Sequence, residues 1–172
     1  MPIGVCKLCR QTKELQDSHY LPKGAYKANR APALKNPSPV VLSNDEVLQS
    51  SAQLSDYMLC RDCEQKFNEN GEKWVLRNIP RNYAERFPIV DALNAEVPLL
   101  ADGGTKLYAG AAAKSLDMTK IVYFAISVFW LGAVHKWEST LRSEAPEVHL
   151  CAYEEPLRQF LLGHHHSLTM WR

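Results

Sequence analysis

The chain has 172 residues, of which 46% are hydrophobic and 23% are charged, and its formal net charge at pH 7 is +1. The longest apolar run, Ile121 to Val134, is shorter than the roughly 20 residues that cross a bilayer, so composition excludes a membrane-spanning protein. The near-neutral charge neither requires nor excludes a nucleic-acid partner, and only local clusters of charge are informative. The first ten residues lack a secretion leader, so we expect a cytoplasmic protein.

Two Cys-x-x-Cys pairs, Cys6/Cys9 and Cys60/Cys63, are the most specific pattern in the chain. In a reducing compartment, four cysteines with this spacing are typical ligands of Zn²⁺ rather than disulfide partners. Four thiolates saturate the ion and leave no position for water or substrate, so the predicted zinc is structural. Cys151 is left over, and we expect it to be an ordinary thiol.

The segment between the two pairs predicts a strand followed by a basic loop. Apolar positions predict a strand from Lys13 to Leu21 that stops at Pro22, with His19 near its end. From Tyr20 to Asn44 there is no acidic residue, and the prolines argue against regular structure. This loop is either a solvated insertion or an arm that contacts phosphates. Candidate backbone contacts are Lys23, Lys27, Arg30 and, in the second cysteine pair, Arg61.

The second pair follows a predicted short strand, Tyr57 to Leu59, and opens a predicted helix from about Asp62 to Leu76. Gly71 weakens the middle of that helix. Three polar residues at spacings of four would share one face of it, beginning beside the zinc. These residues are Glu64, Asn68 and Glu72.

The C-terminal half is expected to be mainly helical. Short extended pieces are predicted from Ile89 to Tyr108, around the turn Ala101-Asp102-Gly103-Gly104. A nearly apolar helix should run from Ser115 or Asp117 to about Leu141 and form the centre of the C-terminal core. A last helix, Glu154 to Leu162, should end at Gly163. We therefore predict an α+β protein with a zinc-stapled ββα unit at 1–88 and a mainly helical region at 89–172.

The N-terminal pattern resembles the HNH, or ββα-metal, endonuclease family over roughly residues 5 to 76. It is similar to a subgroup that reads Ser-His-apolar-apolar-Pro-Lys and later Cys-x-x-Cys-Glu. The residues that carry the resemblance are Cys6, Cys9, Ser18, His19, Tyr20, Leu21, Pro22, Cys60, Cys63 and Glu64. The chain departs from the family in three places: its acid precedes His19 by two residues, Glu64 replaces the final histidine, and the middle asparagine is missing.

The resemblance implies an endonuclease that hydrolyses DNA phosphodiester bonds with a divalent cation, Mg²⁺ or Mn²⁺. His19 would be the general base. Asp17 and Glu64 would bind the cation, with Asn68 one turn further along the helix, and Glu72 fits the subgroup's pattern. Members of this size often act in phage or bacterial defence systems.

Two other readings remain open. One is a non-catalytic treble-clef zinc module that binds nucleic acid or a protein. Its apolar C-terminal region would then dock a partner or a second copy of the chain. The other is a zinc-stabilised subunit that does not act on nucleic acid. Retention of the protein on DNA that does not change with salt concentration would favour this reading.

Overall fold

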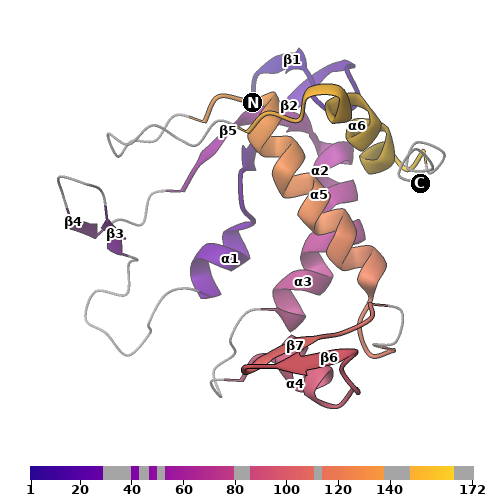
Figure 1. Ribbon diagram of the computed structural model, residues 1–172. Helices are drawn as coiled ribbons and strands as arrows, with labels where there is room; N and C mark the ends of the chain where they lie inside the picture. Colours follow the sequence, from indigo (N-terminus) through magenta and orange to yellow (C-terminus); the bar gives the residue numbers. More distant parts are fainter. Residues whose placement is uncertain are drawn as a thin grey trace.

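The computed structural model describes residues 1–28, 40–42, 47–49, 53–79, 86–110, 114–137 and 148–164, and the structural statements below concern these residues. It is a mixed α+β structure with small antiparallel sheets, which confirms the predicted class (Figure 1). The strands are β1 (Ile3–Val5), β2 (Thr12–His19), β3 (Val40–Leu42), β4 (Val47–Gln49), β5 (Ser55–Cys60), β6 (Leu100–Asp102) and β7 (Thr105–Leu107). The helices are α1 (Lys23–Ala28), α2 (Arg61–Phe67), the π-helical turn η1 (Asn68–Glu72), α3 (Lys73–Asn78), α4 (Pro88–Asn94), α5 (Met118–Val134), the 3-10 turn η2 (Cys151–Tyr153) and α6 (Glu154–Leu162).

A three-stranded antiparallel sheet, in the order β1-β2-β5, brings the two cysteine pairs together. β2 confirms the predicted strand but ends at His19, before the predicted end at Leu21. Its partner β5 leads directly into α2, as the sequence predicted for the second strand and helix. β1, which the sequence did not indicate, covers the other edge of β2.

A bulge in the β2–β5 pairing interrupts the alternation of side chains along β5. Gln16 pairs with Leu59 whereas Asp17 pairs with Tyr57, so Met58 is the extra residue on β5. A β-bulge re-aims the residues beyond it. Three consecutive residues of β5, Met58, Leu59 and Cys60, are therefore all buried, although strict alternation would bury only every second one.

The helical run after the second cysteine pair is longer than predicted and contains a π-helical turn. α2, η1 and α3 form one continuous run that lies alongside α5 and antiparallel to it (Figure 1). Gly71 lies in the π-helical turn, where a Cβ atom would be 3.0 Å from both the amide nitrogen and the Cα of Phe124. The absence of a side chain at Gly71 thus lets the two helices approach each other closely.

Gly71→Ala is expected to lower the free energy of unfolding by about 1–3 kcal/mol, as overpacking does in tight cores. In an open helix the same change would stabilise by roughly 1 kcal/mol. Here the added methyl group meets backbone atoms of Phe124, which cannot rotate aside. Urea denaturation of the zinc-loaded protein measures the effect, with the exposed Lys73→Ala as control. A gain in stability for Gly71→Ala would contradict the proposed packing.

The hydrophobic core joins the zinc-stapled segment to the C-terminal helices. Phe67 of α2 packs edge-on against Tyr123 and Trp130 of α5, with ring centroids 6.1 and 6.3 Å away. The same cluster contains buried residues from the sheet and from α6, including Leu8, Leu15, Met58, Leu59, Leu157, Phe160 and Leu161. The boundary expected at residue 88 stays a prediction, but both sides of it contribute to this core.

Two helices lie in segments for which the sequence predicted no helix. The basic segment predicted to lack regular structure contains α1, which begins directly after Pro22. In the segment predicted to be extended, α4 begins at Pro88. Proline was interpreted as a breaker in both cases, but it is well tolerated at the start of a helix, where its missing N–H has no intrahelical partner. The predicted turn at Gly103-Gly104 is confirmed as the connection between β6 and β7.

The long apolar helix is shorter than predicted. Asp117 is its N-cap, as expected, and its carboxylate accepts a hydrogen bond from the Lys120 amide at 3.0 Å. α5 ends at Val134 instead of near Leu141, because His135 is extended and its ring packs against Trp137. α6 has the predicted bounds and ends at Gly163 with a left-handed φ of 97°. Within the described residues, no helix combines the length and apolar character needed to cross a membrane.

Candidate functional site

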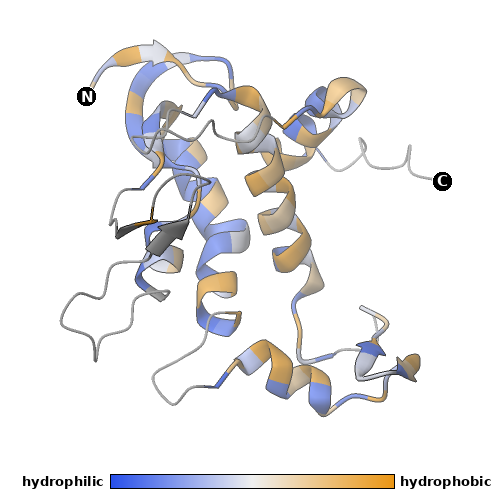
Figure 2. Cartoon of the chain, turned by 60° about the vertical axis from the view of Figure 1, so that its left-hand side comes forward, coloured by the Kyte–Doolittle hydropathy of each residue, from blue (hydrophilic) through white to orange (hydrophobic). Residues whose placement is uncertain are grey.

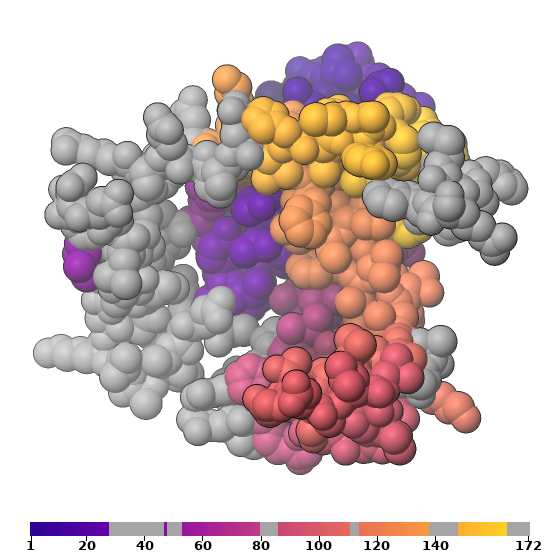
Figure 3. Space-filling view, viewed as in Figure 1, coloured from indigo at the N-terminus to yellow at the C-terminus, as the bar shows by residue number. Residues whose placement is uncertain are grey.

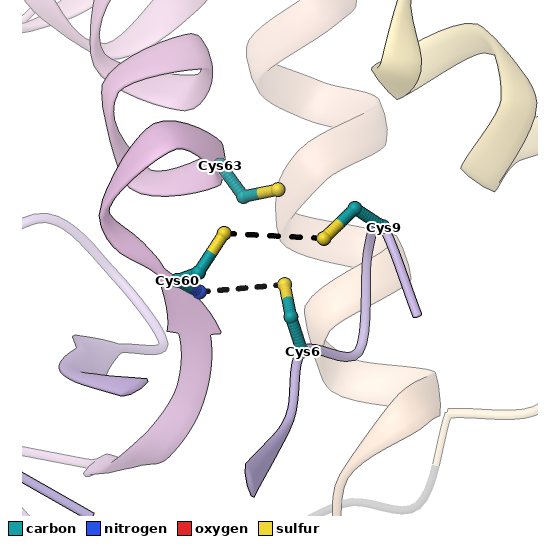
Figure 4. A group of neighbouring side chains, drawn as sticks. All are labelled: Cys6, Cys9, Cys60 and Cys63. Carbon is teal, nitrogen blue, oxygen red and sulfur yellow. Dashed lines mark hydrogen bonds between the residues drawn. The ribbon is translucent and has the colours of Figure 1, made fainter. Parts of the chain in front are cut away.

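The four paired cysteines converge on one point, between the β1–β2 turn and the start of α2. Cys6 and Cys9 lie in the turn between β1 and β2, Cys60 ends β5, and Cys63 lies in the first turn of α2. Figure 4 shows the four sulfur atoms facing a common centre from these two chain segments. Residues more than fifty positions apart in the sequence are therefore held together by the β2–β5 pairing.

The geometry of this four-cysteine cluster suits a tetrahedral metal ion. All four sulfur atoms lie within 4.8 Å of one another, and the Sγ atoms of Cys9 and Cys60 are 3.9 Å apart. Four thiolates bound to Zn²⁺ at about 2.3 Å would be separated by roughly 3.8 Å. All the described cysteines are free thiols. The four-cysteine cluster could therefore hold a metal ion such as zinc.

The protein surroundings already favour a thiolate in this cluster. The pKa of Cys6 is lowered to about 4, chiefly by a hydrogen bond from the Cys63 thiol and also by backbone amides. One of these amides, that of Cys60, donates to the Cys6 sulfur at 3.3 Å. The pKa of Cys63 is raised, because its thiol donates a hydrogen bond to the Cys6 sulfur and is partly buried. Amides aimed at sulfur stabilise the deprotonated form that binds metals.

A buried arginine from α6 supports the first cysteine pair. Arg158 donates a hydrogen bond to the carbonyl oxygen of Leu8 at 2.5 Å, and it is held by Glu155 at 2.6 Å. Glu155 also pairs with Arg10 at 2.7 Å, and the Arg158 guanidinium lowers the pKa of Glu155 to about 2. No sequence pattern indicated this contact, because Leu8 and Arg158 are 150 residues apart.

His19 lies at the end of β2 and is held in one tautomer. Its Nδ1 atom is 3.1 Å from the carbonyl oxygen of Asp17. A carbonyl oxygen can only accept, so Nδ1 carries the proton and Nε2 keeps its lone pair when the ring is neutral. The ring is partly exposed. His19 therefore presents a basic nitrogen, as a residue that accepts a proton from water must.

The residue next to His19 contacts the first helix after the second cysteine pair. Ser18 is buried and its hydroxyl accepts a hydrogen bond from the Leu59 amide at 3.1 Å. Burial raises the pKa of Glu64, and the neighbouring Ser18 side chain offsets part of that rise. The Oε1 atom of Glu64 is buried and has no hydrogen-bond partner among the described residues. Such an unpaired buried carboxylate oxygen is costly and calls for a ligand.

A second half-buried carboxylate, that of Glu72, lies near Glu64. Burial and repulsion from Glu64 raise the pKa of Glu72 to about 7. Asp17 and Lys23 also act electrostatically on Glu64. Asn68, predicted to share a face with these two glutamates, is exposed where η1 interrupts the regular helical spacing. Glu64 thus lies within electrostatic range of Asp17 and of Glu72, whereas Asn68 is exposed. Among the described residues, only the four cysteines form a compact group of metal-ligand atoms.

Glu72→Gln is expected to stabilise the folded protein above pH 7 and to have little effect near pH 4.5. The folded-state pKa of about 7 lies above the ordinary value of 4.5, so wild-type stability falls as the pH rises through this window. The free energy of unfolding falls by up to about 3 kcal/mol, because each unit of difference between the folded and unfolded pKa corresponds to about 1.4 kcal/mol. Glutamine carries no charge and avoids this loss.

Urea denaturation at several pH values, with zinc bound and no other divalent cation added, measures this difference. Glu69→Gln, an exposed carboxylate on the same turn, is the matched control. Equal stability of Glu72→Gln and wild type at pH 8 would contradict the burial of this carboxylate.

The predicted phosphate contacts lie on two elements. Lys23 and Lys27 are exposed on α1, and Arg61 is exposed at the start of α2, whereas Arg30 lies outside the described residues. Two open pockets of about 460 Å³ are found elsewhere, one around Lys13 and Asp62 and one beside Arg10 and Trp130. His19, Glu64 and Glu72 line neither of them.

Sequence reasoning assigned no role of its own to two residues near the site, Ser18 and Glu72. Ser18 was noted only as part of a motif, although its burial and its proximity to Glu64 link β2 to α2. The signals for Glu72 were its fit to the subgroup's pattern and its helical spacing from Glu64, which the π-helical turn then altered. No family model matches this chain, and comparisons with curated proteins and with solved structures find no match.

Proposed function

We propose that the chain is a zinc-stapled, metal-dependent endonuclease of the HNH type, with His19 as its general base. The observation that carries the proposal is the contact between β2 and α2 described above. Ser18 of β2 lies near enough to the half-buried Glu64 of α2 to affect the pKa of its carboxylate, and His19 is the next residue of β2. A basic imidazole and a carboxylate pair are thereby held on adjoining elements.

The role of His19 follows from its tautomer. The hydrogen bond from Nδ1 to the Asp17 carbonyl fixes the ring and leaves Nε2 to accept a proton from a water molecule. The resulting hydroxide attacks the phosphorus atom of a phosphodiester, and the bond to the leaving oxygen breaks. The partial exposure of the ring leaves room for a backbone phosphate of a nucleic acid.

The carboxylates supply hard oxygen ligands for a divalent cation. Glu64, with its unpaired Oε1, and Glu72 would hold Mg²⁺ or Mn²⁺, with Asp17 as a further ligand. A bound cation stabilises the negative charge on the phosphate and the leaving oxygen. A cation also explains why two carboxylates that repel each other are kept half-buried.

The remaining features serve stability and binding. Four thiolates would close the coordination of a structural Zn²⁺ in a treble-clef unit and fix β5 and α2 relative to the first cysteine pair. Lys23, Lys27 and Arg61 are exposed cations that would contact DNA phosphates.

Cleavage assays on the zinc-loaded protein test this proposal. The substrates are supercoiled plasmid, linear duplex, single-stranded DNA and RNA, each with Mg²⁺, Mn²⁺ or no added cation. Nicking or cutting of DNA that needs the added cation supports the proposal. Binding of DNA without cleavage of any substrate would instead favour the non-catalytic zinc module.

A further inference from the structure

The segment from residue 86 to residue 110 has regular structure but no buried side chain. It comprises α4 and the hairpin β6–β7, which we call the α4–hairpin unit. Every residue in it is exposed or only partly buried. Figure 3 shows this unit, in red, at the lower end of the molecule. A two-stranded hairpin on its own is marginally stable in water, so a further surface is needed to cover it.

The side chains that this unit exposes are large and apolar. On the hairpin and the loop before it, Val97 is 87% exposed, Leu99 69%, Leu100 62% and Leu107 57%. Leu100 and Leu107 are direct cross-strand partners, so both point from the same face of the hairpin. Phe87, directly before α4, and Val90 within α4 are also exposed. Figure 2 shows the apolar colour of α4 and of the chain leading into β6.

The area of this surface is close to what a stable protein contact needs. Full coverage of the six apolar residues would bury on the order of 600 Å² per chain, compared with roughly 800 Å² per partner in a standard interface. Exposed apolar surface of this extent is typical of an interaction site.

The charges of the unit favour a second copy of the same chain over a nucleic acid. Its ionisable residues are Arg86, Asp91, Glu96, Asp102 and Lys106, and Arg86 is paired with Asp91 at 2.8 Å. Three acids against two bases do not attract phosphate. In a two-fold contact, however, Asp102 of one chain can meet Lys106 of the other, and the reverse contact forms by symmetry.

We propose that the α4–hairpin unit is the interface of a homodimer of this chain. Leu100 and Leu107 form the centre of the contact, and the reciprocal pairs of Asp102 with Lys106 lie at its rim. Each strand of the hairpin has one partner in the described part of the chain, so its outer edge is also open to pairing with the second copy. This proposal does not depend on the nuclease activity.

Sedimentation velocity of the full zinc-loaded chain, over roughly a hundredfold range of concentration, tests the proposal. Wild type should shift from monomer to dimer, and Leu100→Lys and Leu107→Lys should each raise the dissociation constant at least about tenfold. Phe129→Lys is the control, since Phe129 is 59% exposed on α5 and lies outside the unit. A wild-type chain that stays monomeric at every concentration would overturn the proposed dimer interface. So would a dimer that Phe129→Lys disrupts and that both leucine variants retain.

Hydrogen–deuterium exchange of wild type at low and high concentration gives a second test that needs no variant. Protection that increases with concentration should be confined to residues 86–107. Increased protection in another segment, with none here, would overturn the proposal even if a leucine variant fails to fold.

Discussion

Replacing His19 with alanine is expected to slow cation-dependent plasmid nicking by roughly 10²- to 10⁴-fold, the usual contribution of a general base. The reason is the fixed tautomer: Nδ1 is engaged by the Asp17 carbonyl, and Nε2 is the atom that accepts the proton. Alanine removes this acceptor and leaves the cysteine cluster and the glutamates in place. Initial rates at saturating Mg²⁺ give the ratio directly.

The matched control is His149→Ala, which changes an exposed histidine outside the site. Both variants should keep wild-type zinc content and unfolding temperature, because neither histidine belongs to the hydrophobic core. Partial recovery of the His19→Ala rate on addition of free imidazole would support the role of a base. Equal nicking by His19→Ala and wild type would remove His19 from the mechanism.

Cys63→Ser is expected to abolish zinc binding and with it the stable fold. Structural zinc contributes on the order of 10 kcal/mol of binding free energy in small zinc units, comparable with the whole stability of a typical domain. Cys63 is buried among Cys6, Cys60 and the core, so a serine there also leaves an unpaired hydroxyl. Zinc content by mass spectrometry and circular dichroism on heating measure the two effects.

Cys151→Ser is the control for this experiment, because Cys151 is a free and exposed thiol outside the cluster. It should retain one zinc ion per chain and the wild-type melting temperature. A Cys63→Ser protein that keeps both its zinc and its melting temperature would contradict the structural role of the cluster. Chelation of zinc from wild type should reproduce the Cys63→Ser phenotype.

Local patterns in the sequence predicted the elements whose causes are local. The cysteine pairs, the N-cap at Asp117 and the C-cap at Gly163 each follow from a few neighbouring residues, and the structure has the corresponding cluster and helix ends. α1 and α4 were missed for a local reason as well. Proline directly before or at the first position of a helix looks the same in sequence as proline that prevents one.

The remaining features depend on contacts between distant residues. The π-helical turn at Gly71 is matched to the backbone of Phe124, which no helical periodicity could indicate. The change of register at Met58 lets β5 bury three consecutive residues, and α6 reaches back to Leu8 through Arg158. Of these features, the π-helical turn bears on the candidate carboxylate site, because Glu72 lies in it. Helical spacing alone therefore could not show that Glu72 is half-buried near Glu64 while Asn68 is exposed.

Binding of Mn²⁺ to the zinc-loaded protein, followed by the electron paramagnetic resonance signal of free Mn²⁺, tests the central claim most directly. It requires no knowledge of the nucleic-acid substrate. We predict about one Mn²⁺ per chain, displaced by Mg²⁺ and weakened at least tenfold by Glu64→Gln but not by the exposed control Glu69→Gln. No Mn²⁺ binding by wild type, or equal binding by Glu64→Gln, would contradict the assignment of a catalytic cation to this site.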